Sequence, residues 1–176
     1  MRSEALARRF AAAFVVVLAV ASAIYLAGAR VNLTRSAPLG LYWTSCASIT
    51  QGEYVAFCPP RSKIFDIAKL RGYIGAGFCQ SGYGYLIKRV LAAKGDDVDI
   101  QPEGIQVNGV RVPHSAQRST DLDGRTLPLL RLHVRSLPES ALLLLSDSSD
   151  TSFDARYFGL SDRSQVMSVL QPVWTF

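Results

Sequence analysis

The sequence predicts a mainly β protein, with a single N-terminal transmembrane or signal helix followed by a compact antiparallel β domain. Phe10–Ala29 is a run of 20 residues without a charge, which is the length a helix needs to cross a bilayer. Short runs rich in Val, Ile and aromatic residues dominate after Arg30. The 176 residues suffice for one domain of ordinary size. We expect residues 1–29 to form a membrane anchor or signal segment and residues 30–176 to form the folded domain.

The charges around the uncharged run predict its orientation. Three arginines precede it, Arg2, Arg8 and Arg9, which favours a cytoplasmic N-terminus and an exported remainder. Two interpretations stay open, a retained anchor or a cleaved signal peptide, and Ala27 and Ala29 suit a cleavage site. The run is long for the core of a signal peptide, which favours the anchor.

The remaining composition excludes several classes of protein. No second run of this kind exists, which excludes a multi-span transporter. The net charge is +5 and basic residues alternate with acidic ones, so the sequence does not indicate a nucleic-acid partner. Three cysteines, Cys46, Cys58 and Cys79, suit an oxidising compartment, where one disulfide leaves one free thiol, or they are small buried residues. Their long spacings argue against zinc, and we expect no metal and no cofactor.

The first half of the domain contains two strand signals around one helix signal. Tyr54–Phe57 is a short β-rich run stopped by two prolines. Ser62–Arg71 has apolar residues at helical spacing. The glycines that follow between residues 72 and 84 match neither a dinucleotide fingerprint nor a phosphate loop, so they predict a turn-rich connection. Tyr83–Val90 alternates and predicts the second strand.

The second half contains strands only. Asn108-Gly109 between two alternating runs, Ile105–Val107 and Val110–Val112, is the signature of a hairpin with a type I′ turn. The polar residues 113–128 predict an exposed loop. Further strands are expected at three places: Leu130–Arg135 with Leu130, Leu132 and Val134 inward, Leu142–Leu145 fully buried, and Val166–Val173 ending near Pro172.

Ser36 stands in front of a stiffened turn. Pro38 fixes one φ angle and Gly40 permits unusual ones, so a nucleophile here is presented to a substrate. From this stretch alone, a linker leaving the membrane is the simpler interpretation, with Ser and Thr present as turn formers.

Lys88 shares a predicted strand face with Leu86 and Val90. Lysine is seldom buried without a partner, and burial lowers its pKa, as a lysine general base requires. Taken alone, a lysine on an edge strand that reaches water is the simpler interpretation.

The stretch Ser146–Gly159 is rich in Asp and Ser and by itself reads as a solvated turn. It is not a calcium loop, because the EF-hand glycine is missing and Phe158 replaces the closing Glu. Histidine is limited to His114 in a polar loop and His133 between arginines, which disfavours a Ser-His-Asp triad. A Ser-Lys pair needs no histidine.

These stretches together resemble the bacterial signal peptidase I family. Ser36-Ala37-Pro38-Leu39-Gly40-Leu41-Tyr42 is similar to its serine box, and the extended form with Asn32 and Thr34 resembles the TraF-type conjugative transfer peptidases. Three further stretches resemble its later boxes in order: Gly52–Phe57, Lys88–Val98 followed by Val107-Asn108-Gly109, and Ser146–Gly159. The order and spacing hold over about residues 10–174.

The departures from the family pattern bear on the last box and on the branch. Ser146, Ser148 and Ala155 replace a glycine, an asparagine and a serine of that box. The chain lacks the large insertion of the housekeeping enzymes, which favours the compact conjugation branch.

The resemblance implies a β domain of signal peptidase I type and a serine peptidase with a Ser-Lys dyad. Ser36 would be the nucleophile and Lys88 the general base. The Ser36 N–H, with the Thr34 hydroxyl, would bind the oxyanion. Ser152 matches the residue that orients the lysine. Asp154 and Arg156 match a paired set in which Asp154 either supports Lys88 directly or holds the turn through Arg156.

For the substrate, the resemblance implies a pilin precursor, from which the TraF-type branch removes a C-terminal peptide and joins the new end to the N-terminal amine. It places the enzyme in the periplasm, tethered to the inner membrane by residues 10–29 or released in soluble form after cleavage. Three alternatives stay open: a non-catalytic envelope scaffold for pilus assembly, a general signal peptidase, and a self-cleaving repressor-type protease, against which the membrane run argues.

Overall fold

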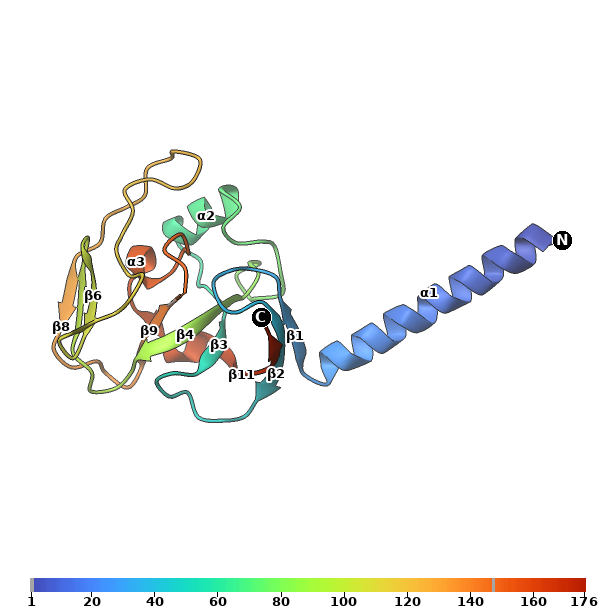
Figure 1. Ribbon diagram of the computed structural model, residues 1–176, viewed down its shortest axis with the longest axis horizontal. Coiled ribbons are helices and arrows are strands. Elements are labelled where there is room, and N and C mark those ends of the chain that lie inside the picture. The colour runs from blue at the N-terminus through green and yellow to red at the C-terminus, as the bar shows by residue number, and fades with distance from the viewer. Residues whose placement is uncertain (1, 147) are drawn as a thin grey trace.

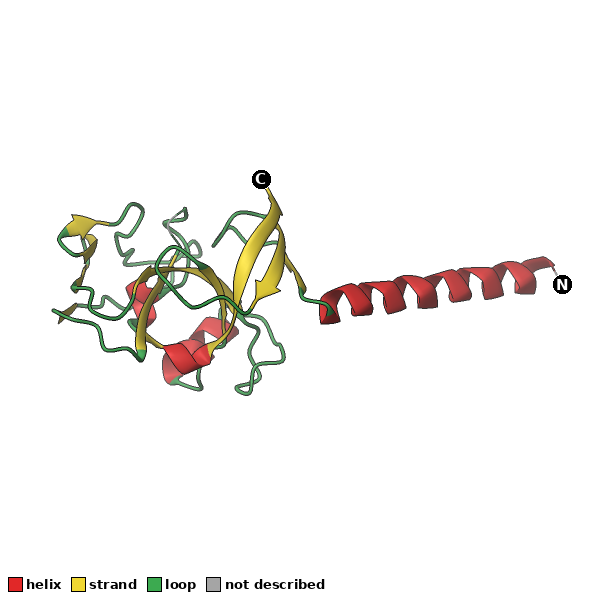
Figure 2. Cartoon of the chain, turned by 90° about the horizontal axis from the view of Figure 1, so that it is seen from below, coloured by secondary structure: helices red, strands yellow, loops and turns green. Residues whose placement is uncertain are grey.

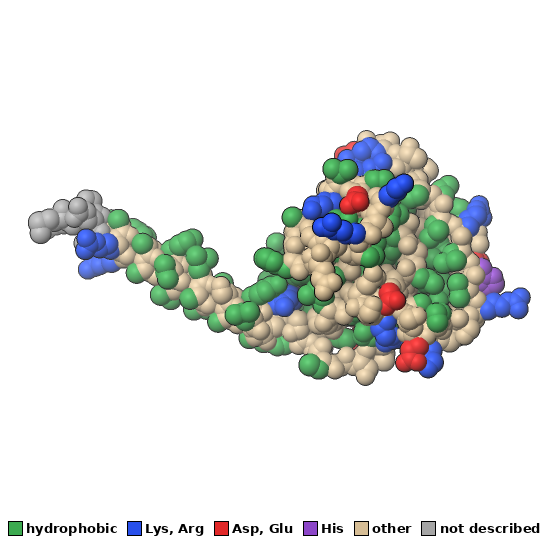
Figure 3. Space-filling view, turned by 180° about the vertical axis from the view of Figure 1, so that it is seen from behind, with side chains coloured by type: hydrophobic (Ala, Val, Ile, Leu, Met, Phe, Trp, Pro, Cys, Tyr) green, Lys and Arg blue, Asp and Glu red, His purple; other side chains and the backbone are tan. Residues whose placement is uncertain are grey.

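The structure, a computed structural model, describes residues 2–146 and 148–176. Helix α1, Arg2–Leu26, projects away from a β domain that contains the rest of the described chain (Figure 1). Within it, Leu6–Leu26 is long and apolar enough to cross a membrane, with a mean hydropathy of 2.2 and no residue buried against the domain. Hydrophobic side chains follow the helix along its length (Figure 3). A single N-terminal apolar helix ahead of a mainly β domain is thus confirmed.

The segment after the helix belongs to the sheet. β1, Ala29–Asn32, pairs antiparallel with β2, Gly40–Ser45, from Ala29 opposite Trp43 to Asn32 opposite Gly40. The interpretation of this segment as a linker is therefore wrong. Its buried residues, among them Ala29 and Asn32, pack on the domain and hold the strand in place.

The larger sheet has seven strands in the order β1-β2-β11-β3-β4-β9-β10, with antiparallel pairing throughout. Its later strands are β3 Tyr54–Phe57, β4 Leu86–Ala92, β9 Ala141–Leu145, β10 Ser161–Asp162 and β11 Val166–Thr175. The strands curl around a core, as Figure 2 shows. The predicted strands at 54–57 and 142–145 are confirmed.

The smaller sheet has the order β7-β6-β5-β8 and lies at the far end of the domain from α1 (Figure 1). Its strands are β5 Val98–Gln101, β6 Gly104–Val107, β7 Val110–Arg111 and β8 Leu132–Val134. Asn108 and Gly109 both have positive φ, 52° and 77°, as a type I′ turn requires. The predicted hairpin is confirmed, and so is the inward packing of Leu130, Leu132 and Val134.

Two short α-helices and one 3-10 turn complete the described domain. They are α2 Lys63–Leu70, α3 Ala155–Phe158 and the 3-10 turn η1 Arg163–Gln165. Helix α2 confirms the helical spacing predicted for 62–71, and it buries Phe65 and Ala68 against a core that includes Val55 and Val90. Burial of these apolar faces is the main force that stabilises the domain.

Three predicted segments differ in detail. β4 begins at Leu86 rather than Tyr83, because Tyr83 forms an isolated bridge with Ala76. β11 continues past Pro172, where a register shift accommodates the missing N–H. The loop 113–128 is folded back on itself through a bridge between Thr120 and Thr126.

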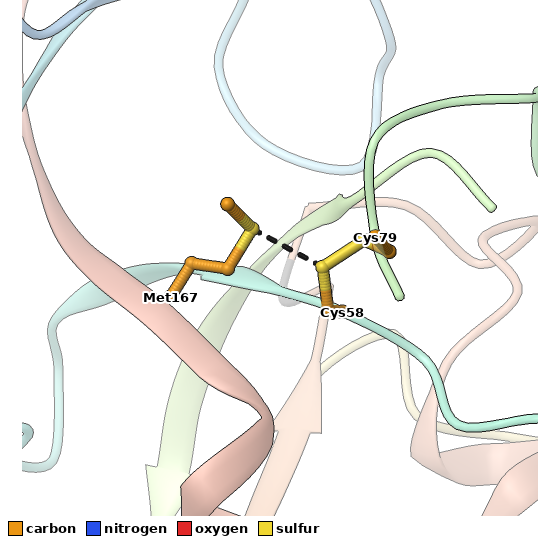
Figure 4. The surroundings of a disulfide bond; sticks show 3 residues. All are labelled: Cys58, Cys79 and Met167. Carbon is orange, nitrogen blue, oxygen red and sulfur yellow. Dashed lines mark hydrogen bonds between the residues drawn. A yellow bond between two sulfur atoms is a disulfide. The ribbon is translucent and has the colours of Figure 1, made fainter. Parts of the chain in front are cut away.

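One disulfide, Cys58–Cys79, joins the residue after β3 to the connection between α2 and β4, and Cys46 is free and exposed. The sequence alone does not determine this pairing. The Cys58 sulfur carries no hydrogen, so its approach to Met167 Sδ at 3.1 Å is a sulfur–sulfur contact with β11 (Figure 4).

Candidate active site

The turn between β1 and β2 presents Ser36 and is organised by one buried amide. We call residues 32–40 the serine turn. Asn32, only 3% exposed, donates through Nδ2 to the carbonyl oxygens of Thr34, Ala37 and Pro38 at 2.9–3.0 Å. Its Oδ1 accepts from the Thr34 N–H at 3.1 Å and from the Thr34 hydroxyl at 2.9 Å. A single side chain on β1 therefore makes five hydrogen bonds that hold the turn.

The end of the serine turn is closed by two further contacts. Gly40 has φ +142°, and a Cβ there would stand 2.0 Å from the Trp174 carbonyl oxygen, so only glycine fits against β11. The buried Tyr42 donates its hydroxyl proton to the Pro38 carbonyl at 2.7 Å. The stiffened turn predicted around Pro38 and Gly40 is present in the structure.

Ser36 lies against the strand that carries Lys88. Its Oγ donates to the Ile87 carbonyl oxygen at 3.3 Å and lies 3.0 Å from Thr34 Oγ1. Ser36 and Lys88 line one cavity of about 640 Å³. No hydrogen bond joins Ser36 to Lys88 within the described residues. In the absence of substrate, catalytic hydrogen bonds are often long and tighten only in the complex.

Lys88 is buried at the centre of the larger sheet. β4 lies between β3 and β9, so Lys88 is not on an edge, and the interpretation as a water-reaching edge lysine is wrong. The side chain is 2% exposed, and Nζ donates to Ser152 Oγ at 2.6 Å. Burial lowers the pKa of Lys88 from 10.5 to about 8, while the Asp154 carboxylate opposes that shift and the Arg156 guanidinium adds to it.

A buried ion pair positions the partner of Lys88. Asp154 and Arg156 are fully buried, with Arg156 Nη2 and Asp154 Oδ2 2.6 Å apart. Arg156 also donates to the carbonyl oxygens of His114, Ser149 and Ser152 at 2.8–3.0 Å. We call Lys88, Ser152, Asp154 and Arg156 the lysine cage. Its loop is held from inside, so the interpretation of this stretch as a solvated turn is wrong.

The two roles considered for Asp154, direct support of Lys88 and holding the turn through Arg156, involve different interactions in the structure. Within the described residues, its carboxylate accepts hydrogen bonds from the Ser146 N–H at 3.0 Å and from the Arg156 N–H, Nε and Nη2. These bonds hold the turn, whereas the negative charge of Asp154 acts on Lys88 by raising its pKa. Asp147, in the same box, lies outside the described residues.

Comparisons with known proteins identify the family of the chain. The family described as signal peptidase, peptidase S26, matches residues 4–175. The chain belongs to this family. It is 54% identical to the plasmid transfer protein TraF of Escherichia coli over 162 residues, which cover 92% of this chain and 91% of that protein. It is 37% identical to the conjugal transfer protein TraF of Agrobacterium tumefaciens strain 15955, over 93% and 92% of the two chains.

These relatives span nearly the whole chain and place it in the TraF-type branch of the S26 peptidases. A crystal structure of a signal peptidase I from Enterococcus faecalis V583 aligns with a TM-score of 0.42 at 18% identity, covering 72% of this chain and 100% of that one.

The predicted site residues fall into two groups. Thr34, Ser36, Lys88 and Ser152 line the cavity. Asp154 and Arg156 do not line it: Arg156 donates to the Ser152 carbonyl oxygen, and Asp154 pairs with Arg156. Sequence reasoning quoted Asn32 but gave it no role. The only available signal was its position two residues before Thr34, because its bonds go to carbonyl oxygens whose direction depends on the folded turn.

Proposed function

We propose that the chain is a serine endopeptidase in which Ser36 is the nucleophile and Lys88 the general base, and that it processes a conjugative pilin precursor. The observation that carries the proposal is a fully buried lysine, with a pKa lowered to about 8, in the same cavity as Ser36. A titratable side chain with a shifted pKa, in a cavity that also contains a nucleophilic side chain, is typical of a catalytic site.

The proposed chemistry begins with neutral Lys88. At pH 7 a group with a pKa of about 8 is neutral in about a tenth of the molecules, far more often than an ordinary lysine. Ser152 Oγ accepts a hydrogen from Nζ, which leaves the nitrogen lone pair to take the Ser36 proton. Ser36 Oγ then attacks the peptide carbonyl, and the lysine returns the proton to the leaving amine.

The oxyanion would form beside the serine turn. We propose the Ser36 N–H and the Thr34 hydroxyl as its donors. The Thr34 hydroxyl now donates to Asn32 Oδ1 at 2.9 Å, so it must rotate to reach the oxyanion. Asn32 Oδ1 keeps the Thr34 N–H as a partner in that state.

The substrate proposal has two supports. Plasmid and conjugal transfer proteins match over nearly the whole chain, which supports a role in conjugation. The pilin precursor itself is what the resemblance to the TraF-type peptidases implies. Cleavage leaves an acyl group on Ser36. Attack on it by water releases a linear product, and attack by the N-terminal amine of the same substrate gives a cyclic one.

We further propose that α1 is retained, so that the enzyme stays tethered to the inner membrane. Ala29 is buried in β1, and the Gly28 carbonyl accepts from the Thr44 N–H at 2.9 Å, so the bonds after Ala27 and Ala29 lie at or inside the sheet. Arg30 also donates to the Tyr25 carbonyl at 2.7 Å and stacks on the Tyr25 ring at 4.0 Å. Mass spectrometry of the mature protein should find residues of α1 at the N-terminus. A chain starting at Gly28 or Arg30 contradicts retention.

The dyad is tested by Ser36→Ala in donor cells, with pilin analysed by mass spectrometry. Processing should stop at a normal protein level, whereas Ser48→Ala on an exposed loop should process as wild type does. Normal processing by Ser36→Ala favours the scaffold. Loss of processing of other exported proteins, rather than of pilin, favours a general signal peptidase.

A further inference from the structure

A loop of the smaller sheet closes one end of the cavity. We call residues 116–128, between β7 and β8, the arm. It reaches from the smaller sheet to the side of α2, as the gold trace at the top of Figure 1 shows. The bridge between Thr120 and Thr126 stiffens it, and Leu127 anchors its base by burial. Six of its residues line the cavity: Arg118, Asp121, Leu122, Asp123, Arg125 and Leu127.

The arm is fastened to the connection between α2 and β4. The Tyr73 hydroxyl donates to Asp121, and Arg71 Nη1 donates to the Thr126 carbonyl at 2.8 Å. Asp121 in turn pairs with Arg125 at 2.6 Å. Side chains at both ends of this contact are engaged, so the arm is a fixed wall of the cavity.

The charges on the cavity wall do not balance. The arginines are Arg35, Arg71, Arg118 and Arg125, and the carboxylates are Asp121 and Asp123. Both carboxylates pair with Arg125, at 2.6 and 2.7 Å. With Lys88 neutral, the wall keeps an excess of positive charge, which attracts a negatively charged group of the substrate.

Arg118 is the arginine of the arm best placed to receive that group. Its backbone N–H donates to the hydroxyl of buried Tyr157 at 3.2 Å, which fixes the residue. Its guanidinium is only loosely engaged, 3.9 Å from Asp150 Oδ2 and 3.5 Å from the Thr120 carbonyl. Both side chains of the pair with Asp150 are partly exposed, and such a pair contributes little and exchanges partners readily.

We propose that Arg118 determines specificity by binding a carboxylate of the substrate chain beside the dyad. This inference rests on the proposed function. Asp150 precedes Ser152 by two residues, so the group bound by Arg118 lies next to the loop that holds Lys88. The carboxylate belongs either to an Asp or Glu side chain near the scissile bond or to the C-terminus of the substrate. An arginine fork recognises both through paired charge-assisted hydrogen bonds.

Peptide binding to the full-length Ser36→Ala protein in detergent micelles tests this without turnover. The probes are fluorescein-labelled decapeptide pools, random except for one position fixed as Glu or Gln, each made with a C-terminal acid or amide. We expect the carboxylate form of one pairing to bind about tenfold more tightly than its neutral partner. A Glu preference identifies a side chain, and an acid-over-amide preference identifies the C-terminus.

In the Ser36→Ala protein, a second substitution, Arg118→Gln, should bring the ratio of the carboxylate and neutral affinities to about one. Arg118→Lys should retain part of the preference for carboxylate. The matched control is Arg131→Gln, at an exposed arginine that donates to Gln101 on the smaller sheet, outside the cavity. An unchanged ratio in Arg118→Gln, or equal binding of carboxylate and neutral peptides, overturns the inference. A carboxylate preference that depends on Arg118, in a protein whose wild type cleaves none of the pools, contradicts the proposed function instead.

Discussion

The serine turn and the lysine cage border the same cavity, but different forces hold them. The serine turn lies at the surface, with Ser36 half-buried, and is fixed by neutral hydrogen bonds from the Asn32 amide. The lysine cage is buried and contains a full ion pair. In the proposed dyad the nucleophile needs access to substrate, whereas the lysine base needs exclusion from water to lose its proton. The turn at a sheet edge and the lysine on a central strand suit these two proposed roles.

The largest expected effect is on activity when the proposed base, Lys88, is removed. Lys88→Met fills the same buried space without a proton acceptor, and it should lower kcat by about 10²–10⁴-fold. Wild-type activity should rise with pH through about 8, as Lys88 becomes neutral. Residual activity of the variant should lack that rise. A pH–rate profile of both proteins on one peptide checks this, and an identical profile contradicts the role of Lys88.

The next effect is on the stability of the cage. Arg156→Met leaves the Asp154 carboxylate buried and unpaired, and should destabilise the protein by about 3–5 kcal/mol. Arg131→Met on the surface should change stability by less than about 0.5 kcal/mol. Urea unfolding measures both. If the two variants are equally stable, the ion pair does not hold the cage.

The pH dependence of stability distinguishes the contribution of Lys88 from that of the rest of the cage. Its folded pKa lies below its unfolded value, so between pH 8 and 10.5 the unfolded chain binds more protons and stability rises with pH. The rise should reach about 3 kcal/mol in total. Below pH 8 this contribution is absent, because Lys88 is protonated in both states. The difference in unfolding free energy between wild type and Lys88→Met should follow this rise, and a flat difference would count against it.

The smallest effect concerns the serine turn. Asn32→Ala removes the three hydrogen bonds that the Asn32 amide donates to the turn. It should therefore destabilise the protein by about 2 kcal/mol. Activity should fall further than stability, because Ser36 loses its fixed position. Asn32→Asp keeps the acceptor for Thr34 and loses the donors. If Asn32→Asp is as active as wild type, the three donated bonds do not position Ser36.

The sequence predicted several regular elements of the fold better than it predicted the contacts around Ser36 and Lys88. Patterning located the apolar helix, α2, the Asn-Gly hairpin and the buried strand β9, since each depends on local periodicity or a turn signature. It missed β1 because its four residues begin at the last residue of the apolar run and are too few to stand out as a separate alternating segment. The burial of Lys88 and Arg156 was also beyond patterning, because their partners lie far away along the chain or in the folded backbone.

The disulfide makes part of the fold depend on the redox state of the compartment. Cys58–Cys79 closes a segment of 21 residues' separation, and the connection it restrains includes Ile74 and Gly75 on the cavity wall. Closing a loop of that length lowers the conformational entropy of the unfolded chain, which stabilises the folded state by about 3 kcal/mol. The bond persists in an oxidising compartment and not in the reducing cytosol. In the proposed periplasmic location this disulfide forms only after the domain has crossed the membrane, so export itself would complete this part of the fold.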